Sequence, residues 1–148
     1  TEIQPLKDAS GAILVFDGRL DNRAELLSVV GRCPEVTAGS PDPALVLAAY
    51  RVFGEHFAER LNGDFALGLF DPSRAELLLA RDALGMRPLY YYASRELFLF
   101  ASEIKALRAW SAARTTTYWQ TSFSRDWPAI TITARRSSRT FSASSRPT

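Results

Sequence analysis

Cysteine, histidine and long apolar runs are scarce in this sequence of 148 residues. Cys33 is the only cysteine and His56 the only histidine, so the chain cannot form an internal disulfide or assemble a zinc site from these residue types. No apolar run approaches the roughly 20 residues that a membrane-spanning helix needs, and the polar start over residues 1–6 is unlike a secretory signal peptide. These absences predict a cytoplasmic protein without a metal ion or a membrane partner.

The two ends of the chain differ in charge. Residues 1–110 contain 12 Lys and Arg against 15 Asp and Glu, a net charge of −3, whereas residues 111–148 contain six Arg and one acid, a net charge of +5. The last 38 residues also contain eight Ser and eight Thr, without persistent helical or strand periodicity. Their arginines are scattered without helical phasing, which disfavours the alternative of nucleic-acid binding. We therefore predict one domain over residues 1–108 and a disordered or non-native tail over 109–148.

Four short runs rich in aliphatic and aromatic residues follow one another in the second third of the chain. They predict strands at 65–70, 76–81, 88–92 and 96–101. Strands this close in sequence should pair antiparallel. Their apolar pattern is nearly continuous and does not strictly alternate, so both faces of the sheet need cover from a second layer.

The segment before these strands predicts another strand and two helices. The apolar run 12–16 favours a strand that pairs with a short strand nearer the start, and Asp17-Gly18 should end it in a tight turn. A helix is expected over residues 23–30. Asp42, which is followed by proline, has the residue type of an N-cap and predicts the start of a second helix.

A set of motifs runs through the middle of the chain: Leu61-Asn62-Gly63-Asp64-Phe65-Ala66, Arg81-Asp82, Leu84-Gly85, Arg87-Pro88-Leu89-Tyr90-Tyr91 and Ala101-Ser102-Glu103-Ile104-Lys105-Ala106-Leu107. In order and spacing they resemble the glutamine amidotransferase domain of asparagine synthetase-like enzymes, and the resemblance covers about residues 3–108. It implies an α+β fold, an N-terminal nucleophile hydrolase-like αββα sandwich of antiparallel sheets, incomplete at the N-terminus.

The resemblance also implies an activity. Enzymes of this family are ligases that take ammonia from glutamine and form an amide with ATP and Mg²⁺, as in asparagine biosynthesis. The family's nucleophile is the first residue of the mature chain, whereas Cys33 lies in a loop past the second matched motif, so Cys33 is not expected to be catalytic. The nucleophile and the synthetase domain that would bind ATP and Mg²⁺ are expected outside this chain. We therefore expect a fragment that is inactive alone.

Four residues correspond to the family's substrate site. Asp17-Gly18 stands where the family usually has Asn-Gly, whose side-chain amide and backbone N–H form the oxyanion hole. An ionised carboxylate has no proton to donate and repels a developing oxyanion. Arg19 stands where the family commonly has an acid that helps to hold the substrate, and Asp42 matches the acid that receives the α-amino group of glutamine. The residues alone also fit a plain turn, a solvated arginine and a helix cap.

Five further residues form the family's structural signature between two strands: Arg81, Asp82, Gly85, Arg87 and Pro88. We expect ion pairs here that fix the connection, in preference to a catalytic role. His56 should lie on a helix surface.

The departures at Asp17 and Arg19 leave other functions open. One is a degenerate glutaminase domain in a macrolactam (lasso-peptide) or β-lactam synthetase, and another is a non-catalytic interaction module. Sheet neighbours expected upstream of this sequence predict exposed apolar sheet surface and a homodimer. The abrupt change of composition near Arg108 predicts that the tail is a frameshifted reading of a synthetase-domain entrance.

Overall fold

The computed structural model describes residues 4–31, 36–94 and 96–111, together with strands at 118–120, 129–137 and 140–145. Cys33 therefore lies outside the described residues. In chain order the elements are β1 (Leu6–Lys7), β2 (Ile13–Leu20), α1 (Arg23–Val30), α2 (Asp42–Phe53), the 3₁₀ helix η1 (Gly54–Arg60), β3 (Gly63–Asp71), β4 (Glu76–Asp82), β5 (Tyr90–Ala93), β6 (Phe98–Ala101), α3 (Ile104–Ser111), β7 (Tyr118–Gln120), β8 (Ala129–Ser137) and β9 (Thr140–Ser145).

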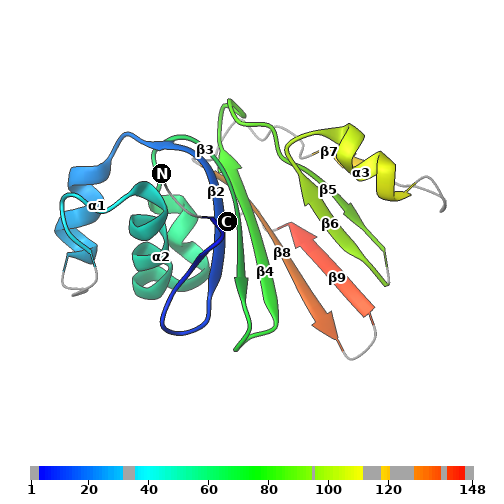
Figure 1. The fold of residues 1–148 in the computed structure, drawn as a ribbon, viewed down its shortest axis with the longest axis horizontal. Coiled ribbons are helices and arrows are strands. Elements are labelled where there is room, and N and C mark those ends of the chain that lie inside the picture. The colour runs from blue at the N-terminus through cyan, green and yellow to red at the C-terminus, as the bar shows by residue number, and fades with distance from the viewer. Residues whose placement is uncertain are drawn as a thin grey trace.

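The described strands form two antiparallel sheets that face each other. The larger sheet has the order β1-β2-β3-β4-β8-β9 and the smaller one has the order β6-β5-β7. Figure 1 shows α1 and α2 against one face of the larger sheet, the smaller sheet on its other side, and α3 beyond the smaller sheet. The four layers are helix, sheet, sheet and helix, as the αββα prediction requires.

Side-chain alternation along β3 builds a core on each face of the larger sheet. Phe65, Leu67 and Leu69 are buried in the core shared with the helices. Ala66 belongs to the smaller core between the sheets, and a Cβ at Gly68 would lie 2.7 Å from the Phe100 ring of the smaller sheet. Both faces of this strand are therefore covered, which confirms that the continuous apolar pattern requires a second layer.

Sequential pairing holds for two strand pairs and fails for one. β3 pairs with β4 and β5 pairs with β6, both antiparallel as predicted. β4 and β5 do not pair, because the connection between them carries the chain from the larger sheet to the smaller one. Pro88 in this connection has no backbone N–H to donate to a ladder, which is consistent with the break.

The prediction of a turn at Asp17-Gly18 is wrong. β2 continues through both residues to Leu20, in register with Ala66 and Phe65 of β3. Gly18 has φ +138, and a Cβ on it would lie 2.0 Å from the Asp64 carbonyl oxygen. Glycine is required here by the close approach of two strands, and the sequence pattern of a turn-forming dipeptide does not distinguish that from a chain reversal.

The second predicted helix ends at a glycine. α2 stops at Phe53, where Gly54 adopts φ +60, and the chain continues as the 3₁₀ helix η1. His56 lies in η1 with an exposed side chain, and its Nδ1 is 2.9 Å from Glu59 Oε1. The expected surface position of His56 is confirmed.

The segment after α3 contains strands that we did not predict. β8 pairs with β4 from Glu76↔Arg135 to Asp82↔Ala129, and β9 pairs with β8. The run Ile130-Thr131-Ile132-Thr133 is β-branched throughout, a local strand signal within a polar composition. The domain division at residue 108 and the frameshifted origin of the tail stay predictions, which the gene sequence would test.

Candidate functional site

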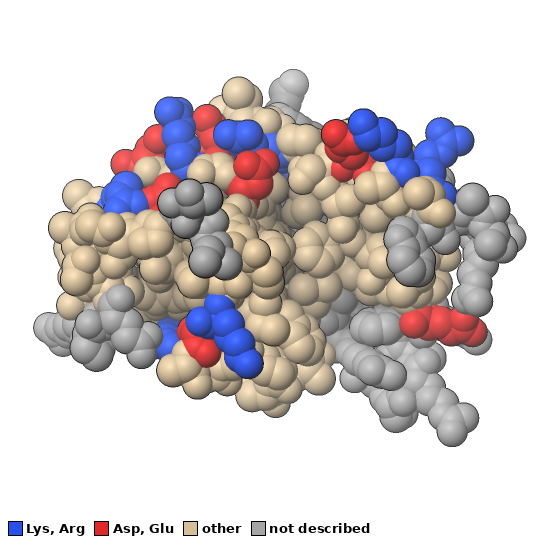
Figure 2. Space-filling view, in the orientation of Figure 1, with Lys and Arg blue, Asp and Glu red and all other residues tan. Residues whose placement is uncertain are grey.

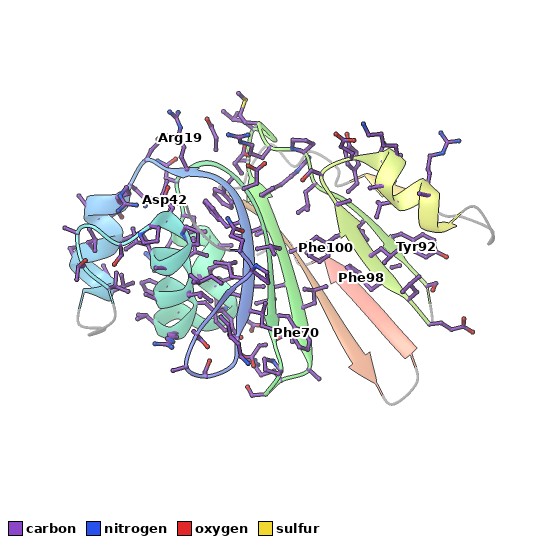
Figure 3. All side chains as sticks on the ribbon, viewed as in Figure 1. Arg19, Asp42, Phe70, Tyr92, Phe98 and Phe100 are labelled. Atoms are coloured by element: carbon purple, nitrogen blue, oxygen red, sulfur yellow. The ribbon has the colours of Figure 1, made fainter. Side chains whose placement is uncertain are left out.

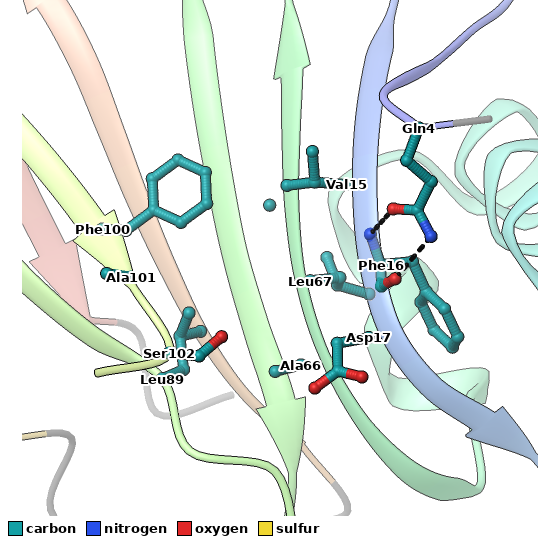
Figure 4. A pocket seen from close by; sticks show the side chains of 11 residues that line it. Gln4, Val15, Phe16, Asp17, Ala66, Leu67, Leu89, Phe100, Ala101 and Ser102 are labelled. Carbon is teal, nitrogen blue, oxygen red and sulfur yellow. Dashed lines mark hydrogen bonds between the residues drawn. The ribbon is translucent and has the colours of Figure 1, made fainter. Parts of the chain in front are cut away.

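Hydrogen bonds along the free edge of β2 define the candidate site. The side-chain amide of Gln4 accepts a hydrogen bond from the Phe16 N–H and donates one to the Phe16 carbonyl, each 2.7 Å long (Figure 4). Four residues further along β2, the Leu20 N–H donates to Asp42 Oδ2 at 2.8 Å. Because successive residues of a strand direct their N–H groups to opposite edges, the Gly18 N–H faces the same edge between these two positions. Gly18 thus directs a backbone donor to the open side of the sheet.

Asp17 lies beside this donor with an accessible carboxylate. Its side chain is 57% exposed, and its Oδ1 is 3.6 Å from Arg87 Nη1. That separation makes an ion pair without a hydrogen bond, and exposed pairs of this kind contribute about 0.2–1 kcal/mol. The carboxylate can accept hydrogen bonds but cannot donate one to an oxyanion at this position.

Arg19 is held among acids at the end of β2. Its side chain is 67% exposed, with Nη2 at 3.3 Å from Asp64 Oδ2 and Nε at 3.6 Å from Asp21 Oδ1. Figure 2 shows acidic and basic residues gathered along the upper edge of the molecule, and Figure 3 places Arg19 at that edge, above Asp42. Arg19 is a solvated arginine with acidic neighbours, as the residues alone predicted.

Asp42 is the first residue of α2 and not its N-cap, so the capping prediction is wrong. The N-cap is Pro41, and the Asp42 side chain points away from the helix start toward β2. Its Oδ1 accepts a hydrogen bond from the Arg23 guanidinium, which also donates to the Ser40 carbonyl at 2.6 Å. Both carboxylate oxygens are therefore engaged, because β2 and α1 converge on the start of α2.

The signature connection is a turn organised by Asp82. This carboxylate is 4% exposed and accepts the N–H groups of Met86 at 3.0 Å and Arg87 at 3.3 Å. Gly85 has φ +67, and a Cβ there would lie 3.4 Å from the Arg81 guanidinium. The N–H groups of Met86 and Arg87 that donate to Asp82 hold the shape of the connection, and the ion pair of Arg87 with Asp17 links it to β2. The same turn places Arg87 beside Asp17.

A pocket lies between the two sheets with Asp17 at one end. It has a volume of about 220 Å³ and is lined by Gln4, Val15, Phe16, Asp17, Ala66, Leu67, Gly68, Leu89, Phe100, Ala101 and Ser102. In Figure 4 the carboxylate of Asp17 and the hydroxyl of Ser102 lie at the same end, and the ring of Phe100 lies at the other. Sequence reasoning missed Gln4, Arg23 and Ser102 as site residues. The alternation of side chains along a strand, applied to residues 4–6 paired with residues 14–16, could have indicated Gln4. No local sequence pattern marks Arg23 or Ser102.

Comparison with known proteins decides the family. The family model described as a glutamine amidotransferase domain matches residues 1–109, which is more than two thirds of the chain. The chain belongs to the glutamine amidotransferase domain family. The match covers Asp17, Gly18, Arg19, Asp42 and the whole signature connection.

Relatives of this amidotransferase domain are longer enzymes. Asparagine synthetase [glutamine-hydrolyzing] 3 of Bacillus subtilis is 33% identical over 96 residues, which is 65% of this chain and 16% of that protein. Asparagine synthetase B [glutamine-hydrolyzing] of Escherichia coli is 35% identical over 96 residues, which is 64% of this chain and 17% of that protein. The chain therefore spans less than a fifth of the length of these relatives.

A solved structure confirms the fold. The glutamine phosphoribosylpyrophosphate amidotransferase of B. subtilis, solved with ADP and GMP, superimposes with a TM-score of 0.67 at 17% identity, covering 97% of this chain and 31% of that one. The predicted N-terminal nucleophile hydrolase fold with its αββα sandwich is thus confirmed for this amidotransferase domain.

Metal-binding clusters and membrane-spanning helices are both absent from the part of the chain that the structure describes. Among residues 4–31, 36–94 and 96–111, no three His, Cys, Asp or Glu side chains come together in a way that could hold a metal ion. Within the described elements, no helix has both the length and the apolar character needed to cross a membrane.

Proposed function

We propose that this chain is the amidotransferase module of an ATP-consuming enzyme that forms amide bonds and takes its nitrogen from glutamine. The observation that carries the proposal is the open edge of β2, where the Gly18 N–H lies between positions filled by Gln4 and Asp42. A backbone donor fixed by a sheet is suited to a developing oxyanion, because it needs no reorganisation during the reaction. The names of the two relatives support glutamine as donor and an amide as product.

Two observations favour a second candidate, a degenerate glutaminase module within a macrolactam or β-lactam synthetase. Asp17 supplies a carboxylate where the family's oxyanion hole needs a donor. The Arg23 guanidinium is bound to Asp42, so the ammonium of glutamine would have to displace a cation that is already hydrogen-bonded. Both features weaken glutamine hydrolysis without disturbing the fold.

The variant Asp17→Asn separates the two candidates in the full protein that the gene encodes. One oxyanion donor contributes about 10²–10³ in rate. A module that hydrolyses glutamine slowly because of Asp17 should therefore release ammonia at least tenfold faster as D17N. Asp21→Asn, which changes a carboxylate that is 53% exposed at the same edge, is the matched control and should leave the rate unchanged.

The nitrogen source completes the test. ATP-dependent amide formation with glutamine supports the first candidate. Amide formation that requires added ammonium or an amine, with no gain in D17N, supports the second. A protein that forms no amide with any nitrogen source contradicts both and leaves a non-catalytic interaction module. The chain by itself is still predicted to release no ammonia from glutamine.

ATP, Mg²⁺, a cytoplasmic location and a homodimer belong to the same proposal. Among the residues that the structure describes, no three His, Cys, Asp or Glu side chains come together to hold Mg²⁺, and the proposal places ATP and Mg²⁺ in a synthetase domain outside this chain. Sedimentation of the chain tests the dimer, since exposed apolar sheet surface favours self-association. A compact monomer with a cooperative melt at high temperature would contradict that part of the proposal.

A further inference from the structure

The walls of the pocket between the sheets are apolar because small residues stand where two sheets meet. Ala66 and Ala101 leave space that larger side chains would fill, whereas the space over Gly68 is filled by the Phe100 ring, which closes one end. A Cβ on Gly68 would lie only 2.7 Å from the Phe100 ring, so the ring is packed against the strand and does not swing freely toward it. The volume of about 220 Å³ accommodates a short aliphatic chain, and the residues between the two ends are mostly apolar.

The polar atoms available at the other end are hydrogen-bond acceptors. Asp17 presents a carboxylate whose nearest cation, Arg87, lies 3.6 Å away, beyond hydrogen-bond distance. Ser102 is exposed and lines the same end of the pocket from the smaller sheet (Figure 4). Gln4 also lines the pocket, but both ends of its amide are used by the Phe16 backbone. A ligand group that enters this end meets a negative charge and a hydroxyl oxygen.

We propose that this pocket binds a primary ammonium group carried on a short unbranched aliphatic chain. The ammonium donates to the Asp17 carboxylate and to the Ser102 hydroxyl, and the methylenes lie along Ala66 and Leu89 toward Phe100. An ammonium has three N–H donors and no acceptor, so it matches this end of the pocket. A carboxylate at the same place would be repelled by Asp17, and a neutral alcohol would gain one weaker hydrogen bond.

This inference goes beyond the proposed function, because it concerns equilibrium binding by this chain and does not depend on ATP or on glutamine. It also explains how a site with a carboxylate at position 17 can still bind a ligand. The Asp17 carboxylate cannot donate to an oxyanion, but it can accept hydrogen bonds from a cationic amine. Binding without amide formation, or amide formation without binding, would therefore separate the failure of one proposal from the failure of the other.

The test is a titration of the 148-residue chain with n-propylammonium and n-butylammonium, followed by NMR chemical shifts and by calorimetry. The longer amine should bind about fourfold more tightly, since each buried methylene contributes about 0.8 kcal/mol. Butyrate should not bind, and 1-butanol should bind at least fivefold more weakly than the amine. Asp17→Asn should weaken the amine at least fivefold and leave 1-butanol unchanged, while the control Asp21→Asn should match the wild type.

A second variant keeps the proposal testable if Asp17→Asn fails to fold. Ala101→Val places a β-branched residue on a strand position that accepts it and narrows the pocket, so it should weaken both the amine and the alcohol. Three results would each overturn the proposal. The wild type could bind the amine and the alcohol equally, its affinity could be independent of chain length, or both variants could bind with wild-type affinity.

Discussion

The two faces of the larger sheet are packed in different ways. On the helix face, Phe57, Phe65 and Leu69 are fully buried, and 20 buried residues form one continuous core. On the face toward the smaller sheet, the buried core among the side chains that the structure describes contains Ala66, Leu79 and Leu89, with partly buried hydrophobic side chains packed against it. The comparison predicts that the helix face contributes more to stability, while a pocket lies on the other face.

Phe57→Ala should give the largest effect and would test the helix face directly. The ring is 0% exposed and packs edge-on against Tyr50, with ring centroids 5.5 Å apart. Removing a buried phenyl ring leaves a cavity, so the free energy of unfolding should fall by about 3–5 kcal/mol. Urea denaturation measures the change. His56→Ala, at the exposed neighbouring position, should change stability by less than about 0.5 kcal/mol. Equal effects of the two variants would contradict the packing described for this face.

Tyr50→Phe should give the next largest effect, because it removes a buried hydrogen bond to a carboxylate. The Tyr50 hydroxyl donates to Asp71 Oδ2 at 2.7 Å. Burial alone raises the pKa of Asp71, but hydrogen bonds from Ser73, from Tyr50 and from backbone N–H groups outweigh it and hold the pKa below its usual value of 3.8. Loss of one hydrogen bond to a charged group should cost about 1.5–3 kcal/mol at neutral pH.

The same pair predicts how this cost depends on pH. The folded pKa of Asp71 is lowered, so its stabilisation is present above about pH 3.8 and is lost as the pH falls through the folded value. Burial, and then the hydrogen bond to Asp71, raise the pKa of Tyr50 above its usual 10.0, so its contribution is lost only in strong alkali. The difference in stability between wild type and Tyr50→Phe should therefore be constant from pH 5 to 9 and shrink below pH 4. A difference that grows in acid would contradict this assignment.

Phe100→Ala tests the other face and should cost less than Phe57→Ala. Its ring is only partly buried, so we expect a loss of about 1–2 kcal/mol in the free energy of unfolding. The variant should also enlarge the pocket between the sheets and accept a longer alkylammonium chain. A loss as large as that of Phe57→Ala would show that the two faces contribute equally, against the comparison drawn above.

Arg87→Ala should have the smallest effect on stability. Arg87 and Asp17 are about half exposed and 3.6 Å apart, so removing the pair should change stability by less than about 1 kcal/mol, and less still in high salt. A double-mutant cycle with Asp17→Asn measures the coupling between the two side chains. A coupling above 2 kcal/mol would mean that the pair is structural, and the carboxylate would then not be available to a ligand.

Much of the fold was predictable because local patterns and tertiary structure agree. The strands β3, β4, β5 and β6 were predicted from runs of aliphatic and aromatic residues, and their two pairings from short turns. The αββα sandwich was predicted from a resemblance carried by spaced motifs. Two of the failures share one cause. Asp17-Gly18 has the composition of a turn, but pairing with β3 keeps it within a strand. Asp42 has the residue type of an N-cap, but its carboxylate accepts a hydrogen bond from Leu20 of β2.

The sequence by itself determined the amidotransferase family, the strands β3 to β6 and the positions of the unusual residues Asp17 and Arg19, because these depend on residue type and spacing along the chain. Only the tertiary structure decided that Gln4 completes the edge of β2, that Arg23 is bound to Asp42, and that Asp17 and Ser102 meet at one pocket. Each of these contacts joins elements separated by a turn, a helix or a change of sheet. Their geometry depends on how layers pack, which no local pattern of residues specifies.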